Sequence, residues 1–152
     1  MKFMNLWSSS YKSKQGNLGL GKAISLFSEI GLTILLPLND TQDYDLAVDL
    51  GGILKRISVK TTRFMSKSGK FKVLLKRCGG SSGKSKITLF NNNSSDFLFC
   101  YTKNNEAYVI PTRIITVKGS LTLTESLDLY KVLKDGKINL SALEEILDVE
   151  AP

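Results

Sequence analysis

The stretch that decides the fold is DYDLAVDLGGILKRISVKTT, residues 43–62. Residues 44–50 and 53–62 are rich in apolar and β-branched side chains, and they flank Gly51 and Gly52. Two such runs separated by a two-glycine turn predict a β-hairpin. The rest of the chain can be placed relative to this hairpin.

The predicted hairpin carries a carboxylate and an ammonium group at matching ends. Asp45 lies near the start of the first strand and Lys60 near the end of the second. Because alternate residues of a strand share a face, Ser58 and Lys60 should point the same way, while Val59 points into the core and offers its carbonyl. The pair is either a metal ligand with a catalytic cation, or two solvated side chains on a sheet.

The remaining elements follow from periodicity and turn residues. Helical spacing over residues 17–30 predicts a helix that ends at Gly31. Further strands are predicted at 32–38, 70–77, 86–90, 96–102 and 106–111, with a short extended piece after Pro111. TESLDLYKVL and LSALEEILDV predict two tail helices, with Thr124 and Ser141 as N-caps and Glu144 completing a capping box with Ser141. This order predicts an α/β fold with a mixed central sheet flanked by helices.

The length of 152 residues suits one domain. We expect an N-terminal arm at 1–15, a core at 16–118 and a C-terminal helical extension of the same domain at 119–152. No apolar run reaches the length of a membrane span, and the apolar stretch in the first residues is too short for a secretory signal. We therefore expect a cytoplasmic protein without membrane contact, with Cys78 and Cys100 as free thiols.

The distribution of charge indicates a polyanionic partner. The net charge is +7, and residues 50–95 hold eleven basic side chains and no acidic one. Such a block is either a nucleic-acid surface or a solvated sheet face, and its length without a compensating acid favours nucleic acid. The predicted DNA contacts are Arg63, Lys67, Lys70, Lys72, Lys76, Arg77, Gly79, Gly80, Lys84 and Lys86, with Arg63 and Arg77 as candidates for reading guanine.

Two classes of chemistry are excluded by residue type and spacing. The chain contains no histidine, which excludes histidine-based triads and histidine-ligated zinc. CGGSSGKS, residues 78–85, resembles a nucleotide-binding P-loop, but Cys78 occupies the position of its first glycine and KITLF after it predicts a strand rather than a helix. Its glycines and lysines suit contacts with a phosphate backbone.

Several segments in order resemble the PD-(D/E)XK nuclease superfamily, which includes restriction enzymes and junction resolvases. The segments are GNLGLGKAISLF, LPLND, YDLAVD, RISVKT, DFLFCYT and YVIPTR, within about residues 15–115. They are most similar to the branch that contains a cyanobacterial homing endonuclease encoded in a group I intron. The resemblance implies a restriction-endonuclease-like core, with Asp45 as metal ligand, Lys60 as catalytic lysine and the Val59 carbonyl as a second ligand.

Two positions depart from the family pattern. Leu20 falls where the family has a helix glutamate, and Ser58 falls where it has Glu or Gln. Three explanations are compatible with this: deliberate changes, a natural site that has drifted, or a different register. Under the third, the acids that could supply the missing oxygen are Glu29, Asp40, Asp43 and Asp49. Asp40 is the best placed, because Glu29 lies about two and a half helical turns beyond Leu20.

The resemblance implies a site-specific double-strand DNA endonuclease of the homing type that depends on Mg²⁺ or another divalent cation. Loss of the two oxygen ligands implies slowed cleavage. A subunit of this size implies a homodimer or homotetramer on a pseudo-palindromic target. The alternatives are a DNA-binding protein with an inactive nuclease fold, and a nuclease that resolves DNA junctions.

Overall fold

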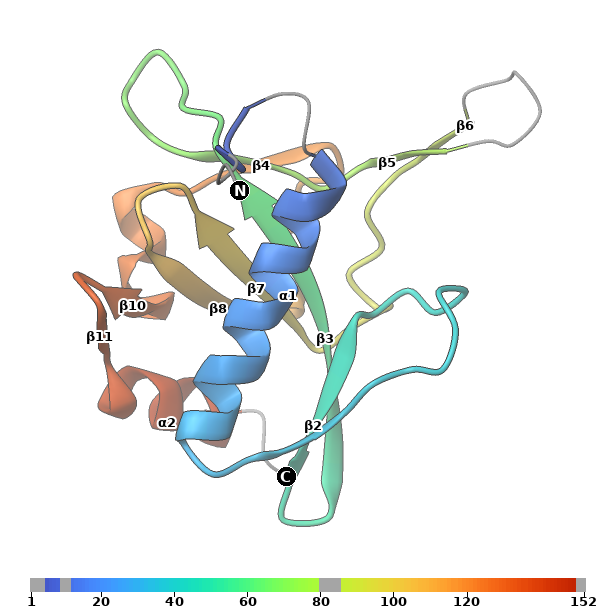
Figure 1. Cartoon of the computed structure of the whole chain (residues 1–152), viewed down its shortest axis with the longest axis vertical. Coiled ribbons are helices and arrows are strands. Elements are labelled where there is room, and N and C mark those ends of the chain that lie inside the picture. Colours follow the sequence, from blue (N-terminus) through green and yellow to red (C-terminus); the bar gives the residue numbers. More distant parts are fainter. Residues whose placement is uncertain (1–4, 9–11, 80–85, 150–152) are drawn as a thin grey trace, which may run out of the picture.

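A computed structural model of the chain describes residues 5–8, 12–79 and 86–149 (Figure 1). Its centre is a seven-stranded sheet in the order β1-β2-β3-β7-β8-β10-β11. Only the β3–β7 pair is parallel, so the sheet is mixed, as predicted. The strands are β1 (Thr33–Leu35), β2 (Leu46–Leu50), β3 (Ile53–Thr62), β7 (Phe97–Thr102), β8 (Ala107–Pro111), β10 (Lys131–Lys134) and β11 (Lys137–Ile138).

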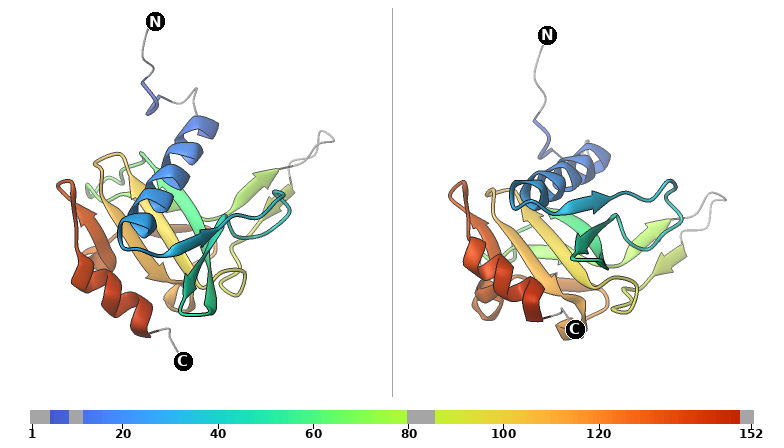
Figure 2. Two further views of the ribbon diagram at one scale, coloured as in Figure 1. Left: turned by 60° about the horizontal axis from the view of Figure 1, so that its bottom comes forward. Right: turned by 90° about the horizontal axis from the view of Figure 1, so that it is seen from below.

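Two small antiparallel ribbons accompany the main sheet. The first pairs β4 (Lys72–Leu74) with β9 (Ser120–Thr122), and the second pairs β5 (Arg77–Gly79) with β6 (Lys86–Thr88). The β5–β6 ribbon projects away from the main sheet, on the side of the loop that joins β1 to β2 (Figures 1 and 2). The basic block is therefore carried partly by a protruding arm.

The β2–β3 hairpin forms as predicted, with a turn that requires glycine. Gly51 and Gly52 have φ values of +64° and +94°. Side chains rarely adopt this conformation, because Cβ then meets the backbone. The Asp49 carboxylate also accepts a hydrogen bond of 2.6 Å from the Gly52 N–H. These contacts fix the register in which Leu46 faces Ile57.

The long helix α1 (Lys12–Glu29) lies across one face of the sheet (Figure 2). It starts earlier than predicted, and Gly19 marks its closest approach to β3. A Cβ added at Gly19 would overlap Thr61 Oγ1 and crowd Val59. The absence of a side chain there lets the helix backbone settle directly onto the strand that carries Lys60.

Two apolar clusters cover the two faces of the sheet. The first holds Ala23 and Phe27 of α1 together with Ile57 of β3, and helix α2 (Leu140–Val149) adds further apolar side chains. The second lies on the opposite face, where Leu98 and Cys100 of β7 meet side chains of β4. Strand alternation thus places residues 57 and 59 toward α1, and Ser58 and Lys60 toward the other face.

The tail differs from its prediction. Residues 125–130 form a 3₁₀ helix, η3 (Glu125–Tyr130), and the segment predicted to continue this helix is instead strand β10. Pairing with β8 buries Val132 in the first cluster, and this non-local gain outweighs helical propensity. Thr124 precedes η3, but its hydroxyl contacts Ser126 rather than capping the helix.

The predicted capping box of the last helix is also wrong. Helix α2 spans the predicted stretch LSALEEILDV, but it is the Asn139 side chain that accepts a hydrogen bond of 3.1 Å from the Ala142 N–H. Asn139 therefore occupies the capping position assigned to Ser141. Asparagine serves this position as well as serine does, because both offer a side-chain oxygen to the unpaired N–H groups.

Several other strand predictions were too long. The predicted strand at 70–77 is divided between β4 and β5, and 3₁₀ helix η2 (Thr112–Ile114) replaces the start of the extended piece after Pro111. Cys78 is exposed and Cys100 buried, and both thiols are free, as predicted. Among the described residues, no helix is long and apolar enough to cross a membrane.

Candidate active site

A cleft of about 550 Å³ lies where α1, the β1–β2 loop, β3 and β5 meet. Its lining includes all five positions predicted from the hairpin and from the family pattern. The lining residues are Leu20, Leu36, Pro37, Leu38, Asn39, Asp40, Gln42, Tyr44, Asp45, Ser58, Val59, Lys60 and Arg77. Segments far apart in the sequence thus converge at one place.

The cleft lies over the free edge of β3. The pairing of β2 with β3 ends at Ile57, whereas the pairing of β7 with β3 continues to Thr62. Asp45 sits at the point of divergence: its N–H donates to the Ile57 carbonyl at 2.9 Å, and its carboxylate accepts from the Val59 N–H at 2.6 Å. The N–H and C=O of one strand residue face the same neighbour, so the Val59 carbonyl also lies on the Asp45 side.

Lys60 enters the cleft from the face opposite α1, beside Cys100 of β7. Burial lowers the pKa of Lys60, and the nearby Arg77 lowers it further, while Asp45 opposes the shift. Burial also raises the pKa of the Cys100 thiol to about 12, so this neighbour is uncharged at neutral pH. The cleft therefore contains a partly desolvated lysine whose pKa is affected by one nearby cation, Arg77, and by one nearby carboxylate, Asp45.

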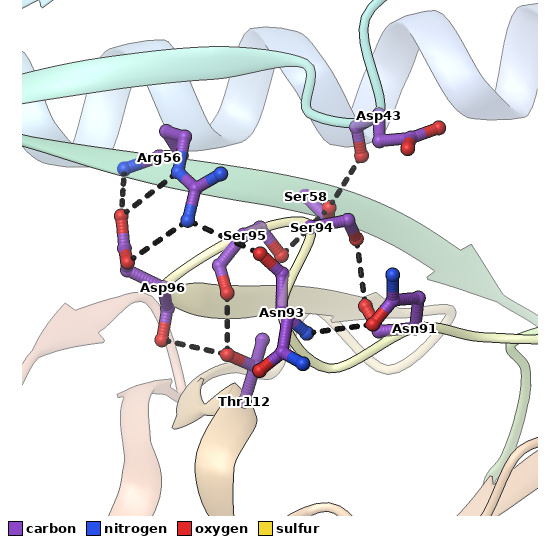
Figure 3. A network of polar contacts seen from close by, with 9 residues as sticks. All are labelled: Asp43, Arg56, Ser58, Asn91, Asn93, Ser94, Ser95, Asp96 and Thr112. Atoms are coloured by element: carbon purple, nitrogen blue, oxygen red, sulfur yellow. Dashed lines mark hydrogen bonds and ion pairs between the residues drawn. The ribbon is translucent and has the colours of Figure 1, made fainter.

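Ser58 is 4% exposed, and its hydroxyl is occupied by structural contacts (Figure 3). Its Oγ lies 3.1 Å from the Asp43 carbonyl and 3.0 Å from Ser95 Oγ. Ser58 Oγ is the donor in both contacts, so its single proton is shared between the Asp43 carbonyl and Ser95 Oγ. These contacts tie the β1–β2 loop to the start of β7, which favours a positioning role for Ser58.

Asp96 closes the same network from the other side of β3 (Figure 3). Its carboxylate accepts hydrogen bonds from the Arg56 N–H at 2.7 Å and from Arg56 Nε at 3.3 Å. Its carbonyl accepts from the N–H of Thr112 at 3.0 Å. Arg56, counted above in the basic block, is thus used to join β3 to β7, and it holds the strand that carries Lys60 in place.

Arg77 is the cleft residue whose position the sequence did not reveal. It was predicted to read guanine, but it lines the cleft from β5 and forms an ion pair of 3.3 Å with Asp43. Its Nη2 also donates to the Asp43 carbonyl at 3.1 Å. No local motif links two residues that are 34 positions apart. The structure therefore adds a second cation beside Lys60.

The four acids considered as substitutes for the missing ligands fall in different places. Asp40 lines the cleft from the β1–β2 loop, and Asp43 lies at its margin with Arg77. Asp49 is held in the hairpin turn, and Glu29 lies in a separate hollow near the end of α1. Asp40 is therefore the acid best placed to join Asp45.

The potential metal ligands of the cleft match the ligand preference of Mg²⁺. The Asp45 carboxylate, the Val59 carbonyl and Asp40 are all oxygen donors, the type that Mg²⁺ prefers. Mg²⁺ keeps several waters and uses few carboxylates, so this set fits the ion. The set is sparse: in the described part of the chain, no cluster of three or more His, Cys, Asp or Glu residues is arranged to hold a metal. Leu20 adds apolar surface where the resemblance led us to expect a carboxylate.

The described residues predicted to contact DNA lie on the sheet face opposite α1 and on the β5–β6 ribbon. Lys72 and Lys76 line a second cavity, Lys67 and Lys86 are exposed, and Gly79 lies in β5. Arg63 lies 4.8 Å above the Phe64 ring, and Lys70 forms an ion pair with Glu125. The predicted contacts that lie outside the described residues are Gly80 and Lys84.

Comparison with known proteins identifies the fold and the family of the chain. The bacterial homing endonuclease I-Ssp6803I has a similar structure, with a TM-score of 0.67 and 24% sequence identity over 92% of this chain and 99% of that chain. This similarity confirms the restriction-endonuclease-like α/β fold. Comparison with curated proteins gave no match. A family model described as PD-(D/E)XK endonuclease matches residues 11–129, so the chain belongs to the PD-(D/E)XK endonuclease family.

Proposed function

We propose that the chain is a divalent-cation-dependent endonuclease that cuts double-stranded DNA at a specific site, in the manner of homing enzymes, with a weakened catalytic site. The observation that carries this proposal is the meeting of Asp45, the Val59 main chain and Lys60 at the free edge of β3. Both the membership in a nuclease family and the fold shared with a homing endonuclease support it.

Each group in the cleft has a distinct task in this proposal. Asp45 and the Val59 carbonyl would hold Mg²⁺, which supplies positive charge to the scissile phosphate when bound. Lys60 stabilises the negative charge that develops on the phosphate oxygens as water attacks. Its partial burial strengthens this interaction, because less solvent screens it.

Arg77 would bind the phosphate next to Lys60. In the free protein its guanidinium is paired with Asp43, and both side chains are largely exposed. A phosphate can replace the Asp43 carboxylate as a partner of the same guanidinium, and it can accept two parallel N–H bonds from it. Arg77 thereby supplies charge that partly compensates for the sparse metal ligands.

The target and the assembly follow from size and charge. A subunit of 152 residues covers only part of a long recognition site. We therefore propose a homodimer or homotetramer on a pseudo-palindromic duplex, since closed symmetric assemblies pair with symmetric sites. The basic side chains of β4 and the β5–β6 ribbon would contact phosphates on either side of the cleft.

The proposal is tested by cleavage of a random-sequence plasmid library in Mg²⁺. Wild-type protein should linearise a subset of plasmids that share a sequence, and Asp45→Asn and Lys60→Met should each lower the rate at least about a hundredfold. Lys134→Met, at an exposed position of β10, is the matched control and should cut like wild type. Equal cutting by Lys60→Met and Lys134→Met would refute the assigned roles.

A second candidate function is DNA binding without cleavage. It is favoured by one observation: Leu20 presents an apolar side chain to the cleft where a metal-binding carboxylate is expected. Tight, sequence-selective binding with no cutting in Mg²⁺ or Mn²⁺ would support it over the first proposal. Cutting of four-way junctions but not of duplex DNA would instead indicate a junction-resolving nuclease.

A further inference from the structure

A second cavity, of about 570 Å³, lies outside the catalytic cleft and is mainly apolar. Its rim carries Phe64, Met65 and Leu74, whose side chains are 55%, 53% and 50% exposed. Lys72 and Lys76 line the same cavity. We call these five residues the Phe64 patch. None of them has a role in the chemistry assigned to the cleft.

The exposure of the patch is imposed by backbone pairing. The Phe64 carbonyl accepts a hydrogen bond of 2.8 Å from the Lys72 N–H, which anchors the segment after β3 to β4. Along β4 and the residues after it, Val73 and Leu75 are buried, so alternation turns Lys72, Leu74 and Lys76 outward. The apolar side chains are therefore displayed on a fixed backbone.

The charges around the patch identify its partner. Lys72 and Lys76 interleave with the apolar groups, and the Arg63 guanidinium lies 4.8 Å above the Phe64 ring. Lysine is depleted from the centres of protein–protein interfaces, whereas aromatic and apolar side chains among basic residues are typical of surfaces that contact both bases and phosphates. Charge complementarity therefore favours DNA as the occupant.

We propose that the Phe64 patch contacts the bases of bound DNA, with Phe64 and Met65 entering the stack at one base step and Lys72 and Lys76 binding the adjacent phosphates. This inference rests on the proposed DNA-cutting function, and it adds a deformation of the target. Phe64 lies four positions after Lys60, so their Cα atoms are at most about 13 Å apart. Both side chains extend beyond their Cα atoms, and one turn of duplex DNA is about 34 Å long, so the deformed step lies within about one turn of the scissile phosphate.

The test places an indole at the patch and measures stacking directly. Phe64→Trp is compared with Leu140→Trp, an exposed control position at the start of α2, and the emission of the natural Trp7 is subtracted. Sheared duplex DNA and heparin are titrated in EDTA, so that no DNA is cut. Both polymers carry dense negative charge, but only DNA has bases.

The proposal expects DNA to quench the Phe64→Trp emission and heparin to leave it nearly unchanged, with no quenching of Leu140→Trp by either. Phe64→Ser should weaken duplex binding about tenfold, in line with the loss of one base–aromatic contact. Equal quenching by DNA and heparin, or DNA binding without quenching, would overturn the patch proposal while leaving the cleavage proposal intact.

Two further outcomes separate the proposals. If neither wild type nor Phe64→Trp binds duplex DNA, both the cleavage function and the patch proposal fail. If Phe64→Ser instead turns an oligomer into a monomer in sedimentation experiments, and its monomer binds DNA as tightly as wild type, the patch is an interface between copies of the chain and the base-contact proposal is wrong.

Discussion

The Lys60 ammonium group is partly buried against β7, and its pKa is lowered first by burial and then by Arg77. A lysine whose pKa is lower in the folded protein than in the unfolded chain destabilises the fold while it is charged. That penalty fades as the pH rises from the lowered pKa toward 10.5, because the unfolded chain then also releases its proton. Functional groups often carry such a penalty.

Lys60→Met should therefore raise the melting temperature at pH 7 while it abolishes cleavage. We expect a gain of about 2–4 °C, which corresponds to about 1 kcal/mol in a domain of this size. The gain should shrink as the pH approaches 10.5. Thermal unfolding at pH 7 and pH 10 measures both effects, and a lower melting temperature at pH 7 would show that the charged lysine stabilises the fold.

Arg77 should affect both the rate and its dependence on pH. Arg77→Ala removes a phosphate-binding cation and should slow cleavage by about 10- to 100-fold. It also removes a charge that lowers the pKa of Lys60, so the loss of activity at alkaline pH should move to higher pH. Lys134→Ala, at an exposed position of β10 outside the cleft, is the control. An unchanged alkaline limit in Arg77→Ala would contradict the coupling.

The sequence predicted that Asp45 and Lys60 lie on one side of the hairpin, but it did not predict the surroundings of Ser58. Asp45 and Lys60 share one hairpin, so strand alternation was enough to place them on one side. The contacts of Ser58 with Asp43 and Ser95 join segments 15 and 37 positions away, which no local pattern reveals. A serine hydroxyl makes both of these contacts, so Ser58 fits its surroundings in the folded chain.

Among the elements, the contact of α1 with β3 depends on one missing side chain. Gly19→Ala should lower the free energy of unfolding by about 1–3 kcal/mol, because the added methyl group overlaps Thr61. Gly21→Ala is the matched control, since a Cβ there meets nothing within 4 Å. Urea unfolding measures both variants. Equal stability of the two would mean that α1 does not pack closely on β3.

Elements with a strong local signal were predicted well, and those formed by distant pairing were not. The β2–β3 hairpin has its turn glycines and two apolar runs in one continuous stretch. Strand β10 has helix-compatible residues, and it becomes a strand because β8 offers it a partner. For the same reason, the prediction of one continuous strand at 70–77 was wrong. The first part of this segment pairs with β9, and its end pairs with β6.

For the whole molecule, the basic face should make DNA binding strongly dependent on salt. The logarithm of affinity falls with the logarithm of salt concentration by about 0.9 for each phosphate neutralised. Lys72→Ala combined with Lys76→Ala should therefore reduce this slope by about two. Lys134→Ala combined with Lys137→Ala, on the exposed β10–β11 hairpin, should leave it unchanged. Equal slopes for the wild type and both double variants would show that DNA does not contact Lys72 and Lys76.

At this scale the sequence predicted the class of fold, because the order of the motifs along the chain is already specific to it. It did not predict that Arg77 joins the cleft. That placement depends on how the β5–β6 ribbon lies against the β1–β2 loop, which is a property of the folded chain. The cleft around Asp45 and Lys60 and the Phe64 patch are likewise assembled from segments that meet only in the folded molecule.

The most direct test of the central claim, that the cleft around Asp45 and Lys60 is a nuclease site lacking one carboxylate, is the cleavage rate of Leu20→Glu in Mg²⁺. Ser28→Glu places the same carboxylate at an exposed position of α1 outside the cleft and serves as the control. We predict that Leu20→Glu cuts a plasmid library about a hundredfold faster than wild type, a difference of about 2.7 kcal/mol in the barrier, and that Ser28→Glu does not. A Leu20→Glu protein that folds, binds DNA and cuts no faster than Ser28→Glu would contradict the claim.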